Sequence, residues 1–296
     1  MSGPADTAPL RVGVAGTGPW AHLVHAPMFA VHPGTTLTAV WGRRLEAAEE
    51  VALPLGAVAH DSFERFLEDV DAVSFAVPPD VQAGLAAVAA RAGKALLLEK
   101  PVALGLTAAE DLAQEVAASG VPTQLLLTWR YRPDVRALLA AAAGARLLGG
   151  QGRFLTGGLL GGMFATPWRL HRGALFDLGP HVIDLLDATL GPVVAVRAHG
   201  DPHRWIGLLL DHEGGAVSEA TLTGHSPVDQ PRAGIAVHTA DGVLEVDTAG
   251  FDPTVLTTVV DEFVATARGR HHALDLARGL HIQGLLDRAA ADLEWA

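Results

Sequence analysis

Residues 10–21 decide the fold, and they read LRVGVAGTGPWA. The apolar run over residues 10–15 predicts a buried β-strand, and a G-x-G-x-x-A fingerprint follows it. The first glycine permits a tight turn, the second lets the backbone approach a pyrophosphate, and the small Ala21 allows a helix to pack closely on the strand. The predicted dinucleotide-binding residues of this loop are Gly16, Thr17, Gly18, Pro19 and Trp20. A glycine turn with a purely structural purpose is the alternative.

Short apolar runs alternate with helical stretches over about the first 127 residues. Strands are predicted at 10–15, 36–41, around 58, 72–77, 95–98 and 123–127, and helices at 19–31, 44–53, 62–67, 81–92 and 107–119. This alternation indicates βαβ units and a parallel sheet with helices on both faces. We therefore predict an α/β fold that begins with a doubly wound Rossmann domain binding NAD(P) over residues 1–125.

The pattern changes after this point. Helices are predicted at 133–143 and 180–190, an extended segment at 145–156, a glycine-rich loop at 157–162, and strands at 193–197, 205–210, 216–223, 234–239 and 243–246. Strands without helices between them indicate an antiparallel sheet. We predict an α+β domain over residues 126–296, with an open, mostly antiparallel sheet, for substrate binding and oligomerisation. Two helices, 255–268 and 274–290, end the chain, and the last of them has an alternative placement against the first domain.

The composition excludes several classes of protein. The formal net charge is −12 and the pI about 5.5, so the chain offers no basic field to nucleic acid or to an anionic membrane. It has no cysteine, which excludes disulfides and thiolate chemistry. No histidine spacing suggests a metal site, so His22, His25 and the histidines other than His181 are interpreted as structural or surface residues. No apolar run approaches the ~18 residues needed to span a bilayer. The first nine residues are predicted to be a loose tail rather than a signal peptide, and a cytoplasmic protein is expected.

The end of the second predicted strand bears on the choice of dinucleotide. NAD enzymes usually carry an acid here that bonds the ribose 2′-hydroxyl. This chain has Gly42, Arg43 and Arg44 instead, which leave room for a 2′-phosphate and offer it charge-assisted hydrogen bonds. NADP(H) is therefore favoured, with NAD(H) as the other possibility. The alternative is that both arginines are simply solvent-facing residues at the start of a helix.

Lysine is rare in this chain. Of 21 basic residues only Lys94 and Lys100 are lysines, and Lys100 lies in LLLEKP, at the end of a predicted strand. Arginine stays protonated, whereas lysine can exchange a proton. Lys100 is thus a candidate for chemistry that arginine cannot perform, although a biased genome that left two lysines by chance is the alternative.

Three segments together resemble the Gfo/Idh/MocA oxidoreductases (the glucose–fructose oxidoreductase and inositol dehydrogenase family). They are the glycine loop, the stretch from VPPD at 77–80 to EKP at 99–101, and GALFDLGPHVID at 173–184, which is similar to the family's D-x-G-x-H-x-x-D signature. The WR pair at 168–169 also fits. Two departures are Gln82, where the family often has histidine, and a glycine run reduced to Gly173-Ala174.

The resemblance implies the roles of individual residues. Lys100 would hydrogen-bond the reacting oxygen, and His181 would take or give the proton of that oxygen. Asp177 would hold the substrate or influence the charge of Lys100 and His181. The chemistry of alcohol oxidation agrees with these roles. Removing hydride from an alcohol also requires a base for its O–H proton, which a histidine can be. The ammonium group of a lysine stabilises the alkoxide that develops. Further implied cofactor contacts are Val77, Pro78, Glu99 and Lys100; further implied substrate contacts are Arg130, Trp168 and Arg169, beside Asp177 and His181. As in relatives, the bond between Lys100 and Pro101 is expected to be cis.

Structural alternatives apply to two of the acids. Asp177 could serve the start of the following helix, and Asp184 could support His181 from the same helix face.

The expected function is hydride transfer between a nicotinamide and a carbinol or carbonyl carbon of a sugar, polyol or similar small molecule. The alternatives are an NAD-dependent, non-redox family member that cleaves glycosides, and a cofactor-binding regulatory protein. Because an open sheet face commonly seeks cover, and by the same resemblance, a homodimer or homotetramer through the second sheet is expected.

Overall fold

Strand β1 (Leu10–Ala15) is an inner strand of a six-stranded parallel sheet in the computed structural model, which describes residues 8–293. The other strands are β2 (Thr35–Trp41), β3 (Val58–His60), β4 (Ala72–Phe75), β5 (Ala95–Leu98) and β6 (Thr123–Leu125). Their order is β3-β2-β1-β4-β5-β6. The order reverses between β1 and β4, and in doubly wound sheets the ligand crevice lies at that reversal.

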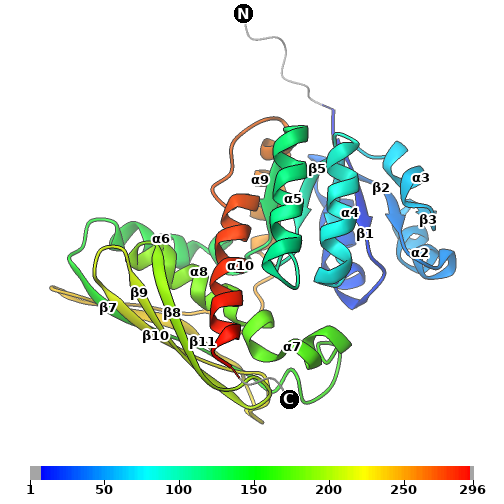
Figure 1. The fold of residues 1–296 in the computed structure, drawn as a ribbon. Helices are drawn as coiled ribbons and strands as arrows, with labels where there is room; N and C mark the ends of the chain where they lie inside the picture. Colours follow the sequence, from blue (N-terminus) through cyan, green and yellow to red (C-terminus); the bar gives the residue numbers. More distant parts are fainter. Residues whose placement is uncertain (1–7, 294–296) are drawn as a thin grey trace, which may run out of the picture. The chain divides into compact units, whose positions relative to one another are not determined.

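The crossover helices of this sheet also follow the sequence prediction. They are a π-helical turn η1 (Ala21–His25) continued by α1 (Ala26–Val31), α2 (Leu45–Ala52) with the 3₁₀ turn η2 (Leu53–Leu55), α3 (Phe63–Glu68), α4 (Pro79–Arg91) and α5 (Leu106–Ser119). Ser62 caps α3, since its Oγ accepts a hydrogen bond from the backbone of Arg65. Figure 1 shows α4 and α5 side by side. The predicted Rossmann architecture is confirmed.

The chain divides into two compact units that interleave along the sequence. The first contains residues up to Leu126 together with Leu256–Gly279, and the second contains Leu127–Val255 and the residues from Leu280 onward. Most of the predicted N-terminal tail, and the last three residues, lie outside the described part of the chain. Among residues 8–293, no helix is both long and apolar enough to cross a membrane.

Helix α9 (Val255–Ala267) packs on the first sheet. The buried amide of Gln124 in β6 donates to the carbonyl of Val259 at 3.1 Å and accepts the hydroxyl of Thr266 at 3.2 Å. The rings of Phe29 and Phe263 lie 6.0 Å apart. These polar and aromatic contacts explain why a segment distant in sequence belongs to the first unit.

The second unit is built on a mixed sheet. Its strands are β7 (Leu147–Leu155), β8 (Val193–Asp201), β9 (Trp205–His212), β10 (Val217–Thr223), β11 (Arg232–Thr239) and β12 (Gly242–Asp247). Its helical segments are η3 (Thr128–Tyr131), α6 (Pro133–Ala142), α7 (Pro167–Asp177), α8 (Gly179–Leu190) and most of α10 (Leu276–Ala291). The strand order is β12-β11-β7-β10-β9-β8, and only β7 and β10 pair in parallel. The prediction of an open, mostly antiparallel sheet is confirmed.

Helix α8 covers one face of this sheet (Figure 1). Glycines in β7 allow the close approach, because a Cβ on Gly152 would lie 2.5 Å from Cγ1 of Val182. Val182, Ile183 and Leu186 are buried there. Alternate residues such as Gln151 and Arg153 point to the other face and are exposed.

Helix α7 was not predicted. No element was assigned to residues 163–179, because PWRLHRGALFD mixes charged and apolar residues without a regular apolar stripe. Pro167 begins the helix, a position where the missing N–H costs nothing. The backbone turns sharply at Gly173 (φ 63°), and a Cβ at this position would collide with the carbonyl oxygen of Pro202. The helix therefore depends on one glycine and on a distant loop.

Candidate active site

The two glycines of the phosphate loop have different surroundings. Gly16 has φ 137°, and a Cβ there would collide with the backbone carbonyl of Ala76 after β4, so the chain's own packing requires this glycine. A Cβ on Gly18 would meet nothing within 4 Å. Packing therefore does not explain Gly18, whereas room for a ligand beside the backbone does.

Other predicted cofactor contacts follow neighbouring strands of the same sheet. Val77 and Pro78 follow β4, and Glu99 and Lys100 follow β5. Because the carboxyl ends of parallel strands share one edge of the sheet, these residues lie at the same edge as the glycine loop. The Lys100–Pro101 peptide bond is cis, as expected.

Glu99 connects the loop to Lys100. Its Oε1 accepts hydrogen bonds from Nε1 of Trp20 at 2.7 Å and from Nε2 of His25 at 3.1 Å. Its Oε2 accepts the backbone N–H of Lys100 at 3.1 Å. Two N–H groups from the loop and the turn that continues it, and one from the backbone of Lys100, thus meet a largely buried carboxylate, whose side chain is 14% exposed.

The two arginines after β2 are exposed. Gly42 precedes them and packs so closely on the phosphate loop that a Cβ there would lie 2.5 Å from Cγ2 of Thr17. Arg44 occupies the N-cap position of α2. Arg43 and Arg44 thus directly follow a residue that contacts the loop, and both side chains reach solvent.

In the second unit His181 lies in the first turn of α8. Its ring stacks on Trp129 with centroids 5.1 Å apart and planes at 29°, and Phe154 lies 6.2 Å away. His181 is 8% exposed. The two aromatic rings define the orientation of the imidazole and shield it from much of the solvent.

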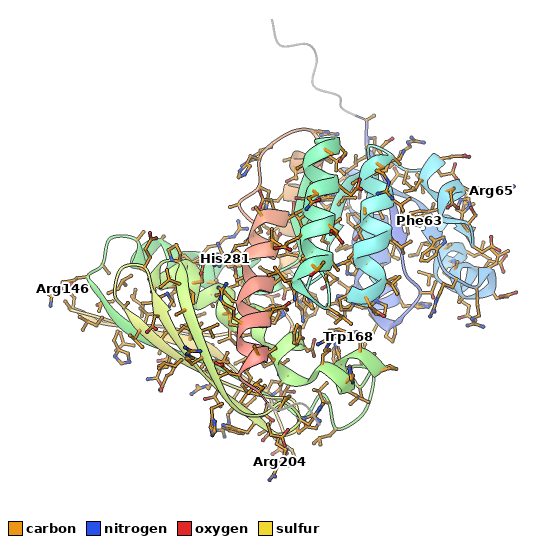
Figure 2. The ribbon with its side chains drawn as sticks, viewed as in Figure 1. Phe63, Arg65, Arg146, Trp168, Arg204 and His281 are labelled. Atoms are coloured by element: carbon orange, nitrogen blue, oxygen red, sulfur yellow. The ribbon has the colours of Figure 1, made fainter. Side chains whose placement is uncertain are left out.

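Asp177 is the last residue of α7 and is buried. Nε of Arg169 donates to its Oδ1 at 3.0 Å, while the Arg169 guanidinium lies 4.6 Å above the ring of Trp168. Trp168 is labelled on α7 in Figure 2. The structure therefore brings together three of the predicted substrate contacts, Trp168, Arg169 and Asp177, on one helix.

Arg130 forms a salt bridge with a buried acid on α8. Its Nη1 donates to both carboxylate oxygens of Asp184 at 3.1 Å, and Asp184 is only 1% exposed. The partner predicted for Asp184 was His181, one turn earlier on α8. The salt bridge with Arg130 supplies charge compensation for this buried acid.

Two family models match the chain. One, described as the oxidoreductase family with an NAD-binding Rossmann fold, matches residues 10–126. The other, the GFO/IDH/MocA C-terminal domain, matches residues 117–245. The chain belongs to the Gfo/Idh/MocA oxidoreductase family. It is accordingly an enzyme that uses an NAD(P) cofactor bound by its Rossmann domain.

Several members of the family are similar to this chain. A dTDP-3,4-didehydro-2,6-dideoxy-α-D-glucose 3-reductase of Streptomyces violaceoruber is 30% identical over 257 residues, which are 82% of this chain and 69% of that protein. The WlbA dehydrogenase from Bordetella pertussis, solved with NADH and UDP-GlcNAcA, has a TM-score of 0.85 at 20% identity, over 96% of each chain. The 3-ketoreductase KijD10 from Actinomadura kijaniata, solved with TDP-benzene and NADP, has a TM-score of 0.75 at 21% identity, over 97% of this chain and 98% of that one. The two structures show the shared fold.

The residues present fit the cofactor of the family. Gly18 leaves open space beside the loop, and backbone N–H groups at the start of the following helix can meet phosphate oxygens. The structures with NADH and with NADP belong to proteins of one fold. The match to the family model with an NAD-binding Rossmann fold establishes an NAD(P) dinucleotide as the class of cofactor, and the preference between NAD(H) and NADP(H) is a separate question.

Two residues of the site were missed from the sequence. His25 was interpreted as structural or surface, and Gln82 only as a departure from the family pattern. Gln82 is fully buried in α4, and its side chain hydrogen-bonds the backbone of Glu99. His25 could have been suspected from its position in a largely apolar helical stretch after the loop, although His22 lies in the same stretch. Nothing local identified its partner.

Proposed function

We propose that this enzyme is an NADP(H)-preferring oxidoreductase that transfers a hydride between nicotinamide and a carbinol or carbonyl carbon of a sugar, polyol or related hydroxylated molecule. The first unit (predicted as residues 1–125) would hold the dinucleotide, and the second (126–296) would bind the substrate and form the oligomer. One observation carries the proposal: the Glu99 carboxylate hydrogen-bonds both the phosphate loop, through Trp20, and the backbone of Lys100. A lysine held in this way beside a dinucleotide loop is placed to hydrogen-bond the reacting oxygen of a bound substrate.

The residue roles follow from the chemistry of an alcohol–carbonyl pair. The bound dinucleotide supplies or accepts the hydride. The Lys100 ammonium donates a hydrogen bond to the reacting oxygen and so stabilises its negative charge. His181 holds or takes the oxygen's proton, a task for which imidazole is suited near neutral pH.

The remaining predicted residues would orient the substrate. Asp177 can accept hydrogen bonds from hydroxyl groups, and Arg169 fixes the position of its carboxylate. Trp168 offers an apolar ring surface, a common partner for the C–H face of a sugar. The relatives support a sugar as substrate, since the Streptomyces protein is named as a sugar 3-reductase and the Bordetella structure contains UDP-GlcNAcA.

The preference for NADP(H) rests on Arg43 and Arg44. Both side chains are exposed directly after Gly42, at the position where NAD enzymes carry an acid. Two guanidinium groups offer charge-assisted hydrogen bonds to a 2′-phosphate.

Binding and turnover test this proposal. NADPH and NADH are titrated into the protein while nicotinamide fluorescence is followed, and NADPH oxidation is then measured with a panel of keto-sugars and aldehydes. We expect NADPH to bind more tightly and at least one keto-sugar to be reduced. Failure of both dinucleotides to bind would overturn the proposal, and tighter binding of NADH would overturn the preference.

We also propose a homodimer or homotetramer formed through the second sheet. The face opposite α8 carries exposed apolar side chains, Trp205 (51% exposed) and Leu209 (49%), beside both Arg153 and Glu219. Such a face can match a second copy of itself, because it contains apolar residues and charges of both signs. Light scattering tests this arrangement, and a clean monomer that remains active would contradict it.

A further inference from the structure

The π-helical turn after the phosphate loop places a histidine in the interior of the first unit. Over Ala21–His25 the backbone N–H of Ala26 bonds the carbonyl of Ala21, five residues earlier. Such turns are rare and occur often at functional sites. Here the turn ends on His25, which is 0% exposed although both its ring nitrogens are polar. A buried imidazole needs partners for both nitrogens.

Both partners of His25 are in place. Nδ1 lies 2.8 Å from Oγ of Ser74 in β4, and Nε2 lies 3.1 Å from Oε1 of Glu99. Glu99 already accepts N–H groups at each carboxylate oxygen, from Trp20 and from Lys100. An ionised carboxylate only accepts, so Nε2 of His25 donates to it, and Nδ1 accepts the Ser74 hydroxyl. One tautomer satisfies the whole arrangement.

This hydrogen-bond network connects three segments whose relative positions matter for the proposed reaction. Ser74 belongs to β4, Trp20 and His25 belong to the phosphate loop and the π-helical turn that continues it, and Glu99 precedes Lys100. Each hydrogen bond in it joins residues distant in sequence, apart from the one to Lys100. Removing one donor leaves a largely buried carboxylate incompletely satisfied, which is costly.

We propose that His25 and Trp20 are positioning residues for Lys100: together they hold the Glu99 carboxylate, which in turn fixes the backbone of Lys100, so that the phosphate loop and the lysine are ordered as one piece. The role assigned to Lys100 in catalysis rests on the proposed function. The ordering of the phosphate loop and Lys100 does not, because it is a property of the protein without a dinucleotide. Neither residue needs to touch the substrate for this effect.

Because the chain has so few lysines, the ordering of Lys100 can be measured directly from the rate at which its side chain is acetylated. Because Lys94 and Lys100 are the only lysines, acetylation by a trace of acetic anhydride, followed by peptide mass spectrometry, gives a Lys100 rate with Lys94 as an internal reference. We expect His25→Leu and Trp20→Phe each to raise the Lys100/Lys94 labelling ratio by about fivefold, the change that corresponds to losing one hydrogen bond of ordinary strength. His25→Gln, whose amide can donate to Glu99 near the position of Nε2, should restore most of the original ratio.

A matched control comes from a second histidine–glutamate pair in the same unit. Nε2 of His272 lies 3.1 Å from Oε2 of Glu262, and His272 also accepts a backbone N–H through Nδ1. His272→Leu should lower thermal stability without changing the labelling ratio. If His25→Leu and Trp20→Phe fold but leave the ratio unchanged, or if His272→Leu raises it equally, the positioning role is wrong.

Activity provides an independent second measurement. In the proposed reaction, His25→Leu should lower kcat more than it raises KM for the carbonyl substrate, and His25→Gln should recover kcat. Labelling is done without dinucleotide, so failure of NADPH to bind the unaltered protein would contradict the proposed function and leave the labelling result standing. An unchanged labelling ratio with normal NADPH turnover would contradict only the positioning role.

Discussion

The side chain of Gln82 and the backbone of Glu99 form a two-way pair of hydrogen bonds. Oε1 of Gln82 accepts the N–H of Glu99 and its Nε2 donates to the carbonyl of Glu99, each at 2.8 Å. The amide lies wholly inside the protein, on α4. It therefore substitutes for a strand partner at the point where β5 ends and the segment with Lys100 begins.

Replacing this glutamine should destabilise the first unit. Gln82→Leu leaves a peptide N–H and carbonyl without their partner, and we expect it to lower the free energy of unfolding by about 1–3 kcal/mol. Gln114→Leu is the control, because Gln114 is an exposed residue of another helix, α5. Urea unfolding measures both. Equal losses in the two variants would show that the hydrogen-bond pair contributes nothing specific.

The sequence predicted the elements with clear boundaries. The structure has β1 at Leu10–Ala15 and β5 at Ala95–Leu98, the predicted limits, because β5 is a continuous apolar run that ends at Glu99 and β1 is a mostly apolar run that ends at Gly16. Composition and local periodicity contain this information. Helix α7 lacks a regular apolar stripe, and its Gly173 turn is stabilised against Pro202, so local pattern could not reveal it.

The partners of individual polar residues were much less predictable. Asp184 was considered as a support for His181, three residues away, and nothing in the sequence indicated its salt bridge with Arg130, 54 positions earlier in the chain. His25 was dismissed, and its carboxylate partner lies 74 positions later. Motifs identify the residues with chemical roles. Which buried groups orient them is decided by packing between distant segments, which one sequence does not show.

Lys100→Arg tests the need for an amine that can approach the reacting oxygen as a compact donor. We expect turnover to fall by about a hundredfold or more, the usual scale for losing a donor that stabilises negative charge on a reacting oxygen, while NADPH binding is largely retained. The control is Lys94→Arg. Nζ of Lys94 donates to the carbonyl of Val70 at 2.8 Å, so this variant should lose a little thermal stability and keep its activity. Similar turnover in the two variants would contradict a specific role for Lys100.

Gly18→Ala tests the reason for the second glycine of the loop. A Cβ at Gly18 meets open space in the protein, so folding should be unaffected, but the methyl group would occupy room needed by the pyrophosphate. We expect dinucleotide affinity to fall by at least about tenfold with an unchanged melting temperature. Gly84→Ala, in α4 and equally open, should leave affinity unchanged. Normal NADPH binding by Gly18→Ala would return the loop to a purely structural interpretation.

Arg43→Ala and Arg44→Ala test the preference between the two dinucleotides. Losing a hydrogen bond to a charged phosphate costs about 1.5–3 kcal/mol, which should weaken NADPH and leave NADH nearly unchanged. Arg65→Ala removes another exposed arginine of the same unit, labelled on α3 in Figure 2, and should alter neither affinity. Fluorescence titration with both dinucleotides measures the ratio. If the affinities for NADPH and NADH fall together, the arginines attract both dinucleotides by their charge and do not bind the 2′-phosphate specifically.

The ion pair between Arg11 and Asp71 should give the protein a pH-dependent share of stability. Nε and Nη2 of Arg11 donate to the two carboxylate oxygens at 3.0 and 2.7 Å, at the start of the neighbouring strands β1 and β4. These hydrogen bonds lower the pKa of Asp71 below its usual range, although partial burial opposes the shift. A carboxyl whose pKa is lower in the folded state stabilises the fold above its unfolded pKa of about 3.9, and this contribution is lost as the pH falls through the folded value.

Arg11→Met should therefore lower the free energy of unfolding at neutral pH, and the loss should shrink towards zero as the solution is acidified below about pH 4. Both side chains are about half exposed, so the expected loss is only about 0.5 kcal/mol, the range of surface pairs. Urea unfolding of the unaltered protein, Arg11→Met, Asp71→Asn and the double variant across this pH range isolates the pair energy. A loss that stays constant with pH would mean that Arg11 acts through packing of its side chain and not through its charge.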